Sequence, residues 1–170
     1  MYRDGHIGAA LLGYSPLGFI VIAAGFPPAA VGGGLLAAAL AMLPDWDMKI
    51  PGVKHRGATH TVHFAAAVAV ATGLLGAGMG STTAPGDPVA IVAAGAFGAA
   101  TGAITILSHI GADALTPMGV KPLGDDGPHV SYDLCRADST VGNTLLLGAG
   151  ATTAIVAFYA GEAVRAGVAG

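Results

Sequence analysis

Charged side chains are scarce in this sequence. Lys, Arg, Asp and Glu make up 10% of its 170 residues, whereas hydrophobic residues make up 54%. An ordinary soluble domain carries about 25% charged residues, and so few charges would not cover the surface of a water-soluble protein of this length. We therefore expect a lipid bilayer to be the solvent for most of the surface.

Cysteine and basic residues are also few. The single cysteine, Cys135, excludes an internal disulfide framework and any zinc module built on a Cys-x-x-Cys pair. Seven Lys and Arg against ten acidic residues give a net charge of −3 without a basic run, which argues against nucleic acid as a partner. The length suits one domain, over residues 1–170.

Long apolar stretches are abundant instead. There are five, at 7–25, 29–43, 61–80, 88–112 and 141–161. A membrane-spanning helix needs about 20 apolar residues, within a range of ~17–25, so four stretches qualify and the second is short. The second stretch either crosses incompletely or forms half of a re-entrant hairpin. We predict an all-α fold, a polytopic membrane bundle of about five spans, with buried core helices as the alternative.

The first apolar stretch is expected to stay as a membrane span rather than to act as a cleaved signal peptide. The residues before it, MYRDGH, have no net positive excess. Its 19 apolar residues also exceed the usual ~7–15 of a signal-peptide core.

Glycine and alanine fill all five stretches. In water, this much glycine would weaken the helices by up to about 1 kcal/mol per residue. In lipid, small residues let helix backbones approach closely. The composition therefore predicts compact packing between membrane helices.

Polar residues concentrate in one segment of this apolar chain. Residues 43–64 read LPDWDMKIPGVKHRGATHTVHF and hold two Asp, two Lys, one Arg and three His. If each apolar stretch crosses the membrane once, this segment lies at the same face as the N-terminus and residues 113–140. Eight polar side chains then share that face: His6, Asp45, Asp47, His55, Arg56, His60, His109 and Asp113.

The spacing of these residues suits a metal site. His109 and Asp113 are four apart at the end of an expected helix, so they share one of its faces. Asp45 and Asp47 lie two apart after a helix-ending proline and point the same way if the turn is extended. Mixed imidazole and carboxylate ligands favour Zn²⁺, with Mn²⁺ or Fe²⁺ as alternatives. Such an ion lowers the pKa of bound water to about 7, and Arg56 would stabilise an anionic transition state.

Four short motifs, in this order, resemble the YdjM-type inner-membrane family. They are His6 before an apolar hairpin, then LPDWD, HRGATHT and SHIGADALTPMGV, all within residues 6–119. The family pattern is an early His, PD-x-D, HRG-x-TH-[ST], and H-x-x-x-D followed by T-x-x-G. The family is described as membrane-bound metal-dependent hydrolases and is linked to LexA regulation in bacteria. The part of the chain after residue 119 matches in general character only.

The resemblance implies metal-dependent hydrolysis at a membrane face. The metal ligands that it implies are His6, Asp45, His60, His109 and Asp113. It implies catalytic or supporting roles for Asp47, His55 and Arg56. It does not give the substrate. Because Lys49 and Lys54 lie beside Arg56 at headgroup level, we favour a phosphoester, either a small molecule or a membrane lipid.

Two other functions fit the same residues. The first is a transporter for a divalent ion or protons, although such proteins place polar groups near the bilayer midplane. The second is a non-catalytic membrane protein with a structural metal site, although structural zinc sites are usually closed by four ligands. The sequence does not give the oligomeric state.

Basic residues also predict the orientation. Six are expected at the face of the polar cluster and one, Arg165, at the other face; the six are Arg3, Lys49, Lys54, Arg56, Lys121 and Arg136. Loops rich in Lys and Arg stay in the cytoplasm. We therefore expect an integral protein of the inner or plasma membrane whose polar cluster faces the cytoplasm.

Overall fold

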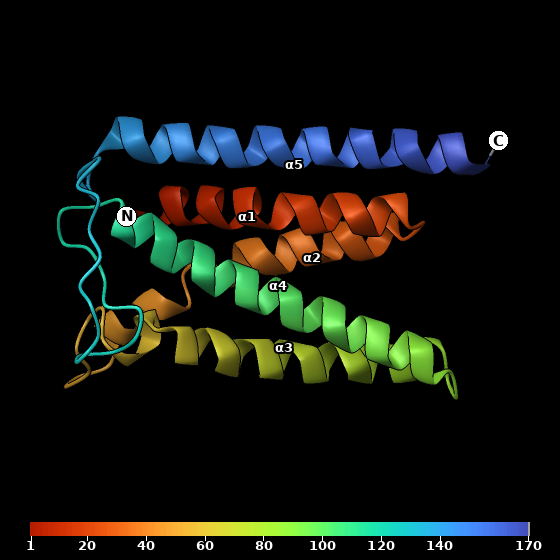
Figure 1. Cartoon of the computed structure of the whole chain (residues 1–170), viewed down its shortest axis with the longest axis horizontal. Helices are drawn as coiled ribbons and strands as arrows, with labels where there is room; N and C mark the ends of the chain where they lie inside the picture. Colours follow the sequence, from red (N-terminus) through yellow and green to blue (C-terminus); the bar gives the residue numbers. More distant parts are fainter. Residues whose placement is uncertain (170) are drawn as a thin grey trace.

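Five long helices make up most of the protein in the computed structural model, which describes residues 1–169 (Figure 1). The helices are α1 (Arg3–Ala23), α2 (Pro27–Leu40), α3 (Val62–Thr83), α4 (Pro88–Ala114) and α5 (Thr140–Ala169). Two short 3-10 helices, η1 (Pro44–Lys49) and η2 (Ala58–His60), lie between α2 and α3. Residues 1–169 contain no strand, only one isolated bridge between Val120 and Val130. The predicted all-α fold is confirmed.

Five segments are long and apolar enough to cross a membrane. They coincide with α1, α3, α4 and α5, and with α2 extended through η1 over Pro27–Lys49. The predicted second stretch is therefore short as an α-helix, 14 residues, but reaches a spanning length because the 3-10 helix continues it.

The helices begin where the sequence supplies N-terminal caps. Asp87 accepts hydrogen bonds from the backbone N–H groups of Val89 and Ala90, which starts α4 directly at Pro88. The hydroxyl of Thr61 accepts from the N–H of Phe64 and starts α3. Such caps satisfy N–H groups that have no partner within the helix. The turns at 24–26 and 84–87 are short because each following helix starts at a proline.

Two helix ends differ from the predicted apolar stretches by four residues or more. α1 begins at Arg3 rather than at residue 7, so His6 lies inside the helix. α5 continues to Ala169, beyond the predicted end at 161. No proline interrupts residues 162–169. Arg165 also pairs with Glu162, three residues earlier on the helix, and such pairs stabilise helices.

The helices lie side by side along the long axis, and the connections sort to the two ends (Figure 1). The site end, as we call it, holds the N-terminus and the long segments 41–61 and 115–139; the distal end holds the two short turns and the end of α5. This arrangement follows from five consecutive crossings. It confirms that the polar segments gather at one end of the bundle.

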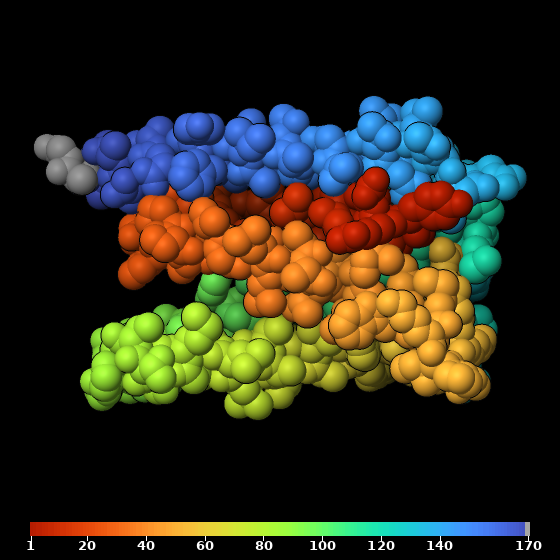
Figure 2. Space-filling view, turned by 180° about the vertical axis from the view of Figure 1, so that it is seen from behind, coloured from red at the N-terminus to blue at the C-terminus, as the bar shows by residue number. Residues whose placement is uncertain are grey.

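Close backbone approach joins the helices in pairs, α1 with α5 and α3 with α4, and α1 also contacts α2 and α4. At Gly150 of α5, a side chain would overlap the carbonyl oxygen of Gly8 in α1; at Gly98 of α4, one would overlap the carbonyl oxygen of Thr72 in α3. The layer formed by α1, α2 and α5 separates from the layer formed by α3 and α4 toward the distal end (Figure 2). Glycine thus has the packing role that the composition predicts.

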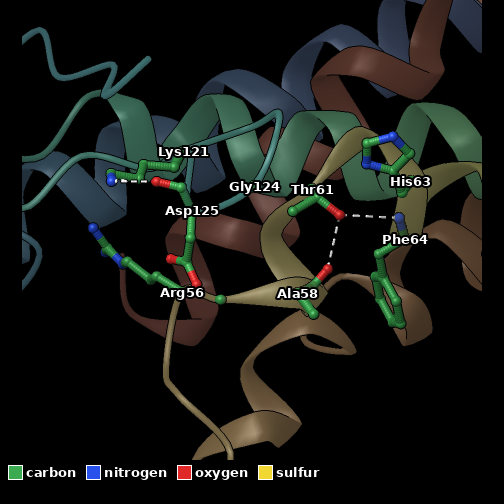
Figure 3. A pocket seen from close by; sticks show the side chains of 9 residues that line it. Arg56, Ala58, Thr61, His63, Phe64, Lys121, Gly124 and Asp125 are labelled. Atoms are coloured by element: carbon green, nitrogen blue, oxygen red, sulfur yellow. Dashed lines mark hydrogen bonds between the residues drawn. The ribbon is translucent and has the colours of Figure 1, made fainter. Parts of the chain in front are cut away.

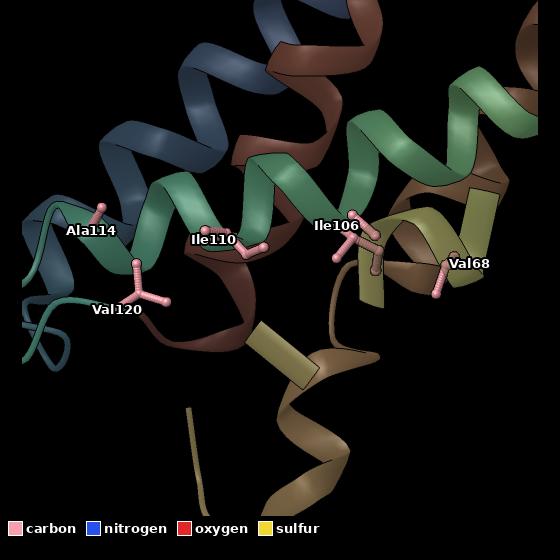
Figure 4. Packing of buried hydrophobic residues seen from close by; sticks show 6 residues of the cluster. Val68, Ile106, Ile110, Ala114 and Val120 are labelled. Atoms are coloured by element: carbon pink, nitrogen blue, oxygen red, sulfur yellow. The ribbon is translucent and has the colours of Figure 1, made fainter. Parts of the chain in front are cut away.

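An apolar cluster supports the last turns of α4, beneath the polar residues. It consists of Ala65, Val68, Ile106, Ile110, Ala114 and Val120 (Figure 4). Ile106 and Ile110 anchor one face of α4, and His109 and Asp113 occupy the neighbouring face of the same turns. The cluster therefore fixes the helix that carries two of the predicted ligands.

Candidate metal centre

Five predicted ligands converge at the site end from four separate elements. His6 comes from the first turns of α1, Asp45 from η1, His60 from η2, and His109 and Asp113 from the last turns of α4. All five side chains are buried. The structure therefore brings together the full set of residues to which the sequence assigns the metal.

Four donor atoms form a compact group. His60 Nε2 lies 3.2 Å from Asp45 Oδ1, 3.2 Å from His109 Nε2 and 3.3 Å from Asp113 Oδ2. His109 Nε2 lies 3.4 Å from Asp45 Oδ1 and 3.6 Å from Asp113 Oδ2. Metal–ligand bonds of about 2.0–2.2 Å in a tetrahedron place neighbouring donors about 3.3–3.6 Å apart. These five distances thus fit neighbouring ligands of one zinc ion with two nitrogen and two oxygen donors.

The outer ring nitrogens of two histidines are already engaged. His109 Nδ1 lies 2.7 Å from the Ala41 carbonyl oxygen, so it is the nitrogen that carries the proton and donates. His60 Nδ1 lies 3.0 Å from the Thr59 hydroxyl, which donates in turn to Asp47 Oδ2. Partners of this kind fix the tautomer and the ring orientation of a metal ligand. Both Nε2 atoms are therefore left to face the centre.

Buried atoms without hydrogen bonds mark the same place. Among the described residues, both ring nitrogens of His6 and Asp113 Oδ2 have no hydrogen-bond partner. Buried polar atoms are nearly always paired, since an unpaired one costs about 1–3 kcal/mol. A divalent cation would satisfy these atoms, and the donor set fits one.

Asp47 supports the group from behind. Its carboxylate accepts a hydrogen bond from the Arg56 backbone N–H and lies 2.9 Å from His55 Nδ1, besides the bond from Thr59. Its oxygen lies 3.4 Å from His60 Nδ1, on the outer side of that ring. Asp47 therefore orients two histidines and the following loop. His55 is the one member that is about a third exposed, 35%.

Arg56 joins the loop before α3 to the end of α4. Its guanidinium donates to Asp113 Oδ1, to the Thr116 hydroxyl and to the Gly119 carbonyl oxygen, and the side chain is 9% exposed. Its φ of 58° is unusual for a residue other than glycine. The terminal nitrogens of Arg56 are thus directed at protein acceptors rather than held free for an anion.

Electrostatics favours positive charge in the centre. Burial lowers the pKa of His60, but the adjacent Asp113 and Asp45 carboxylates more than offset this, so the pKa of His60 lies above its ordinary value. The Met1 amino group also donates to Asp113 Oδ1, at 2.8 Å. Buried carboxylates need such compensation, because an unpaired buried charge costs several kcal/mol.

Sequence reasoning missed several members of the site. Thr59 was identifiable from its place beside His60, and Thr116 and Gly119 from the T-x-x-G motif, which the structure explains as acceptors for Arg56. The Ala41 carbonyl oxygen had no sequence signal, because every residue carries one.

An open pocket of about 460 Å³ is lined by Arg56 but by none of the five candidate ligands. Figure 3 shows Lys121 and Asp125 on the same side as Arg56, with His63 and Phe64 opposite. Lys54 pairs with Asp125, and this pairing holds the pKa of that carboxyl below its ordinary value. The pocket thus combines basic groups with an apolar wall.

The fold and the site together define a polytopic α-helical membrane protein with a buried His/Asp cluster at one end. The model of the YdjM inner membrane protein family matches residues 4–168, so the chain belongs to that family. The match covers nearly the whole chain, including the C-terminal third that the motifs left out. No curated protein and no solved structure matches the chain.

Proposed function

We propose that this protein is a membrane-bound metal-dependent hydrolase. The observation that carries the proposal is the buried donor group, in which five donor–donor distances of 3.2–3.6 Å fit neighbouring ligands of one ion. Zn²⁺ suits this donor set, and Mn²⁺ or Fe²⁺ are alternatives. The residues that would hold metal are His6, Asp45, His109 and Asp113, whose donor atoms lie within 4.8 Å of one another, and His60, whose Nε2 lies within 3.3 Å of donors of the last three. When bound, such an ion activates water for attack at neutral pH.

The other residues would act around that ion. Asp47 holds the rings of His55 and His60, and Arg56 holds Asp113. His55 is the member of the group with access to solvent, so it is placed to take or return a proton during hydrolysis.

The substrate that the site favours is a phosphoester. The pocket beside Arg56 offers Lys121 and His63 to an anionic group and Phe64 to an apolar one. It lies at the site end, where the spanning helices stop and lipid headgroups would be found. A phosphorylated lipid or a small phosphoester would meet both requirements.

Ion transport is supported less well. The middle parts of the helices, residues 16–40, 64–86, 88–108 and 141–158, contain no Asp, Glu, Lys, Arg or His. A conducting pathway places such groups near the bilayer midplane. The cluster instead lies where the helices end.

The proposal includes the orientation of the protein in the membrane, with the site end in the cytoplasm. Six basic residues lie at the site end and Arg165 alone lies near the distal end of α5, an asymmetry that favours a cytoplasmic site end. A membrane-impermeant thiol reagent should leave Cys135, a partly exposed residue of the site end, unlabelled in intact cells and label it after lysis. Labelling in intact cells would reverse the orientation.

The activity is tested on the full chain purified in detergent. Zn²⁺- or Mn²⁺-loaded protein should hydrolyse a phosphomonoester, a phosphodiester or phosphatidic acid in mixed micelles. His60→Ala should abolish the activity, and His129→Ala, at an exposed histidine outside the centre and the pocket, should keep it. Turnover unaffected by His60→Ala would overturn the proposal, as would metal-loaded protein that hydrolyses none of the three substrate classes.

A further inference from the structure

We infer that the centre holds two divalent ions rather than one, with His6 as the ligand of the second. The inference rests on the proposed metal centre and deepens it. It is carried by the ring orientations of three histidines and by the way in which two carboxylates face them.

The rings of His60 and His109 are arranged as two ligands of one ion. Their centroids lie 5.0 Å apart and their planes differ by 66°. Two imidazoles bonded to a single tetrahedral ion diverge from it, with centroids about 5 Å apart. These two rings therefore define the first ion position, together with Asp45 Oδ1 and Asp113 Oδ2.

His6 does not fit that first position. Its ring is stacked on His109, with centroids 3.7 Å apart and planes only 6° from parallel. Parallel rings cannot both aim a nitrogen at one ion with normal bond directions. They can serve two ions that lie side by side, separated by about the stacking distance.

The two carboxylates supply the bridge. Asp45 turns Oδ1 toward His60 and His109, and it turns Oδ2 toward His6 Nε2, at 3.6 Å. Asp113 also turns one oxygen to each side: its Oδ2 faces His60 and His109, and its Oδ1 lies 3.6 Å from His6 Nε2. Each carboxylate therefore has one oxygen for each ion. The 3.7 Å between the stacked rings matches the ion separation of about 3.5–4 Å in two-metal hydrolytic sites.

The environment of the second position predicts weaker binding there. His6 is fully buried and neither of its nitrogens has a hydrogen-bond partner, so a ligand is needed to satisfy it. However, Asp113 Oδ1 already accepts from Arg56 and from the Met1 amino group. A cation at that oxygen would have to share it with them. The first ion should therefore bind tightly and the second more weakly.

A different second position is less well built. Asp45, His55 and His60 also place donor atoms within 4.8 Å of one another. However, His60 Nε2 is directed at the first position, and Nδ1 atoms of His60 and His55 are held by Thr59 and Asp47. The two candidate positions thus predict different results: substitution of His6 should remove the second ion if it lies beside His6, and substitution of His55 should remove it if it lies beside His55.

The experiment titrates the purified full-length protein with Mn²⁺ and follows bound metal and the electron paramagnetic resonance spectrum. The wild type should bind two ions per chain in two steps, and the second should convert the spectrum of an isolated Mn²⁺ into that of a spin-coupled pair. His6→Ala should bind one uncoupled ion. His55→Ala and the exposed-site control His63→Ala should keep two coupled ions. His6→Gln, which preserves a polar side chain, replaces His6→Ala if that variant does not fold.

The outcomes separate this inference from the proposed function. A wild type that saturates at one uncoupled ion overturns the two-ion centre and leaves the metal centre standing. A wild type that binds no ion overturns both. Loss of the second ion in His55→Ala, with two ions kept in His6→Ala, overturns the role of His6.

Discussion

The two ends of the bundle connect the same helices through different kinds of segment. At the distal end, short turns of small and apolar residues connect α1 to α2 and α3 to α4, and Asp87 is used only as a helix cap. At the site end, the long segment 41–61 folds inward, and its Asp45, Asp47 and His60 are buried against His6 of α1 and against His109 and Asp113 of α4. The distal end shows that this fold needs no buried charge to connect its helices.

The contrast explains why the polar cluster is interpreted as functional. A helix bundle in lipid is held by close packing, as at Gly98 and Gly150. Burying carboxylates costs free energy unless a cation compensates them. A segment that served only to connect two helices would therefore be more stable as a short turn without buried charges. The comparison therefore predicts that substitutions at the two ends fail in different ways.

The largest effect is expected from removing one buried charge at the site end. Asp113→Asn leaves Arg56 without its carboxylate partner, and breaking such a buried pair costs about 3–5 kcal/mol. The free energy of unfolding in mixed detergent micelles measures this. Asp126→Asn, at an exposed acid of the same end, should change it by no more than about 0.5 kcal/mol. Equal effects of the two substitutions would show that the buried pair is not formed.

A packing substitution away from the cluster should come next. Gly98→Ala places a methyl group against the Thr72 carbonyl oxygen and should destabilise the α3–α4 pair by about 1–3 kcal/mol, without changing the metal content per folded chain. Gly78→Ala, where nothing lies within 4 Å, is the matched control with the same gain in helix propensity. If both variants are equally stable, the close contact does not hold the helices together.

Asp47 should have an intermediate effect that is confined to the site end. Asp47→Asn keeps the shape but weakens the support of His60 and His55, and loss of such partners typically costs about 10–100-fold in metal affinity or activity. Competition with a fluorescent chelator measures the affinity. An unchanged affinity would show that Asp47 stabilises the loop without supporting the metal ligands.

The smallest effect concerns pH. Because the pKa of His60 is raised in the metal-free protein, a proton competes with the metal below that pKa. Metal affinity should rise by up to about tenfold per pH unit as long as the pH is below the raised pKa, and then level off above it. The stability that His60 gives the metal-free protein has the opposite sign: it is fully present below 6.5 and lost as the pH rises through the raised pKa. Chelator titrations at several pH values measure the first trend, and a flat profile would contradict it.

The sequence predicted the bundle and the residues that meet in it, because apolar length fixes the number of crossings and each crossing fixes the end at which a loop lies. Asp45, His60 and His109 were predicted to meet on that reasoning alone, and they do. The extent of α5 was underestimated, since hydropathy measures the apolar stretch and not the helix.

Side-chain direction was beyond the sequence. Arg56 was predicted to stabilise an anionic transition state, which stays a prediction, but its hydrogen bond to Asp113 and its left-handed backbone had no sequence signal. The Arg56 backbone N–H also donates to Asp47, a contact across nine residues. The stacking of His6 on His109 likewise depends on how α1 and α4 cross.

The most direct test of the account is the metal content of the purified protein. Wild-type protein, dialysed against buffer with trace Zn²⁺ and Mn²⁺ and analysed by mass spectrometry, should retain at least one divalent ion per chain. The His60→Ala/His109→Ala double variant should retain none, while its helix content by circular dichroism stays near that of the wild type. Wild-type protein that is folded and free of metal would contradict the central claim, and so would a double variant that retains as much metal as the wild type.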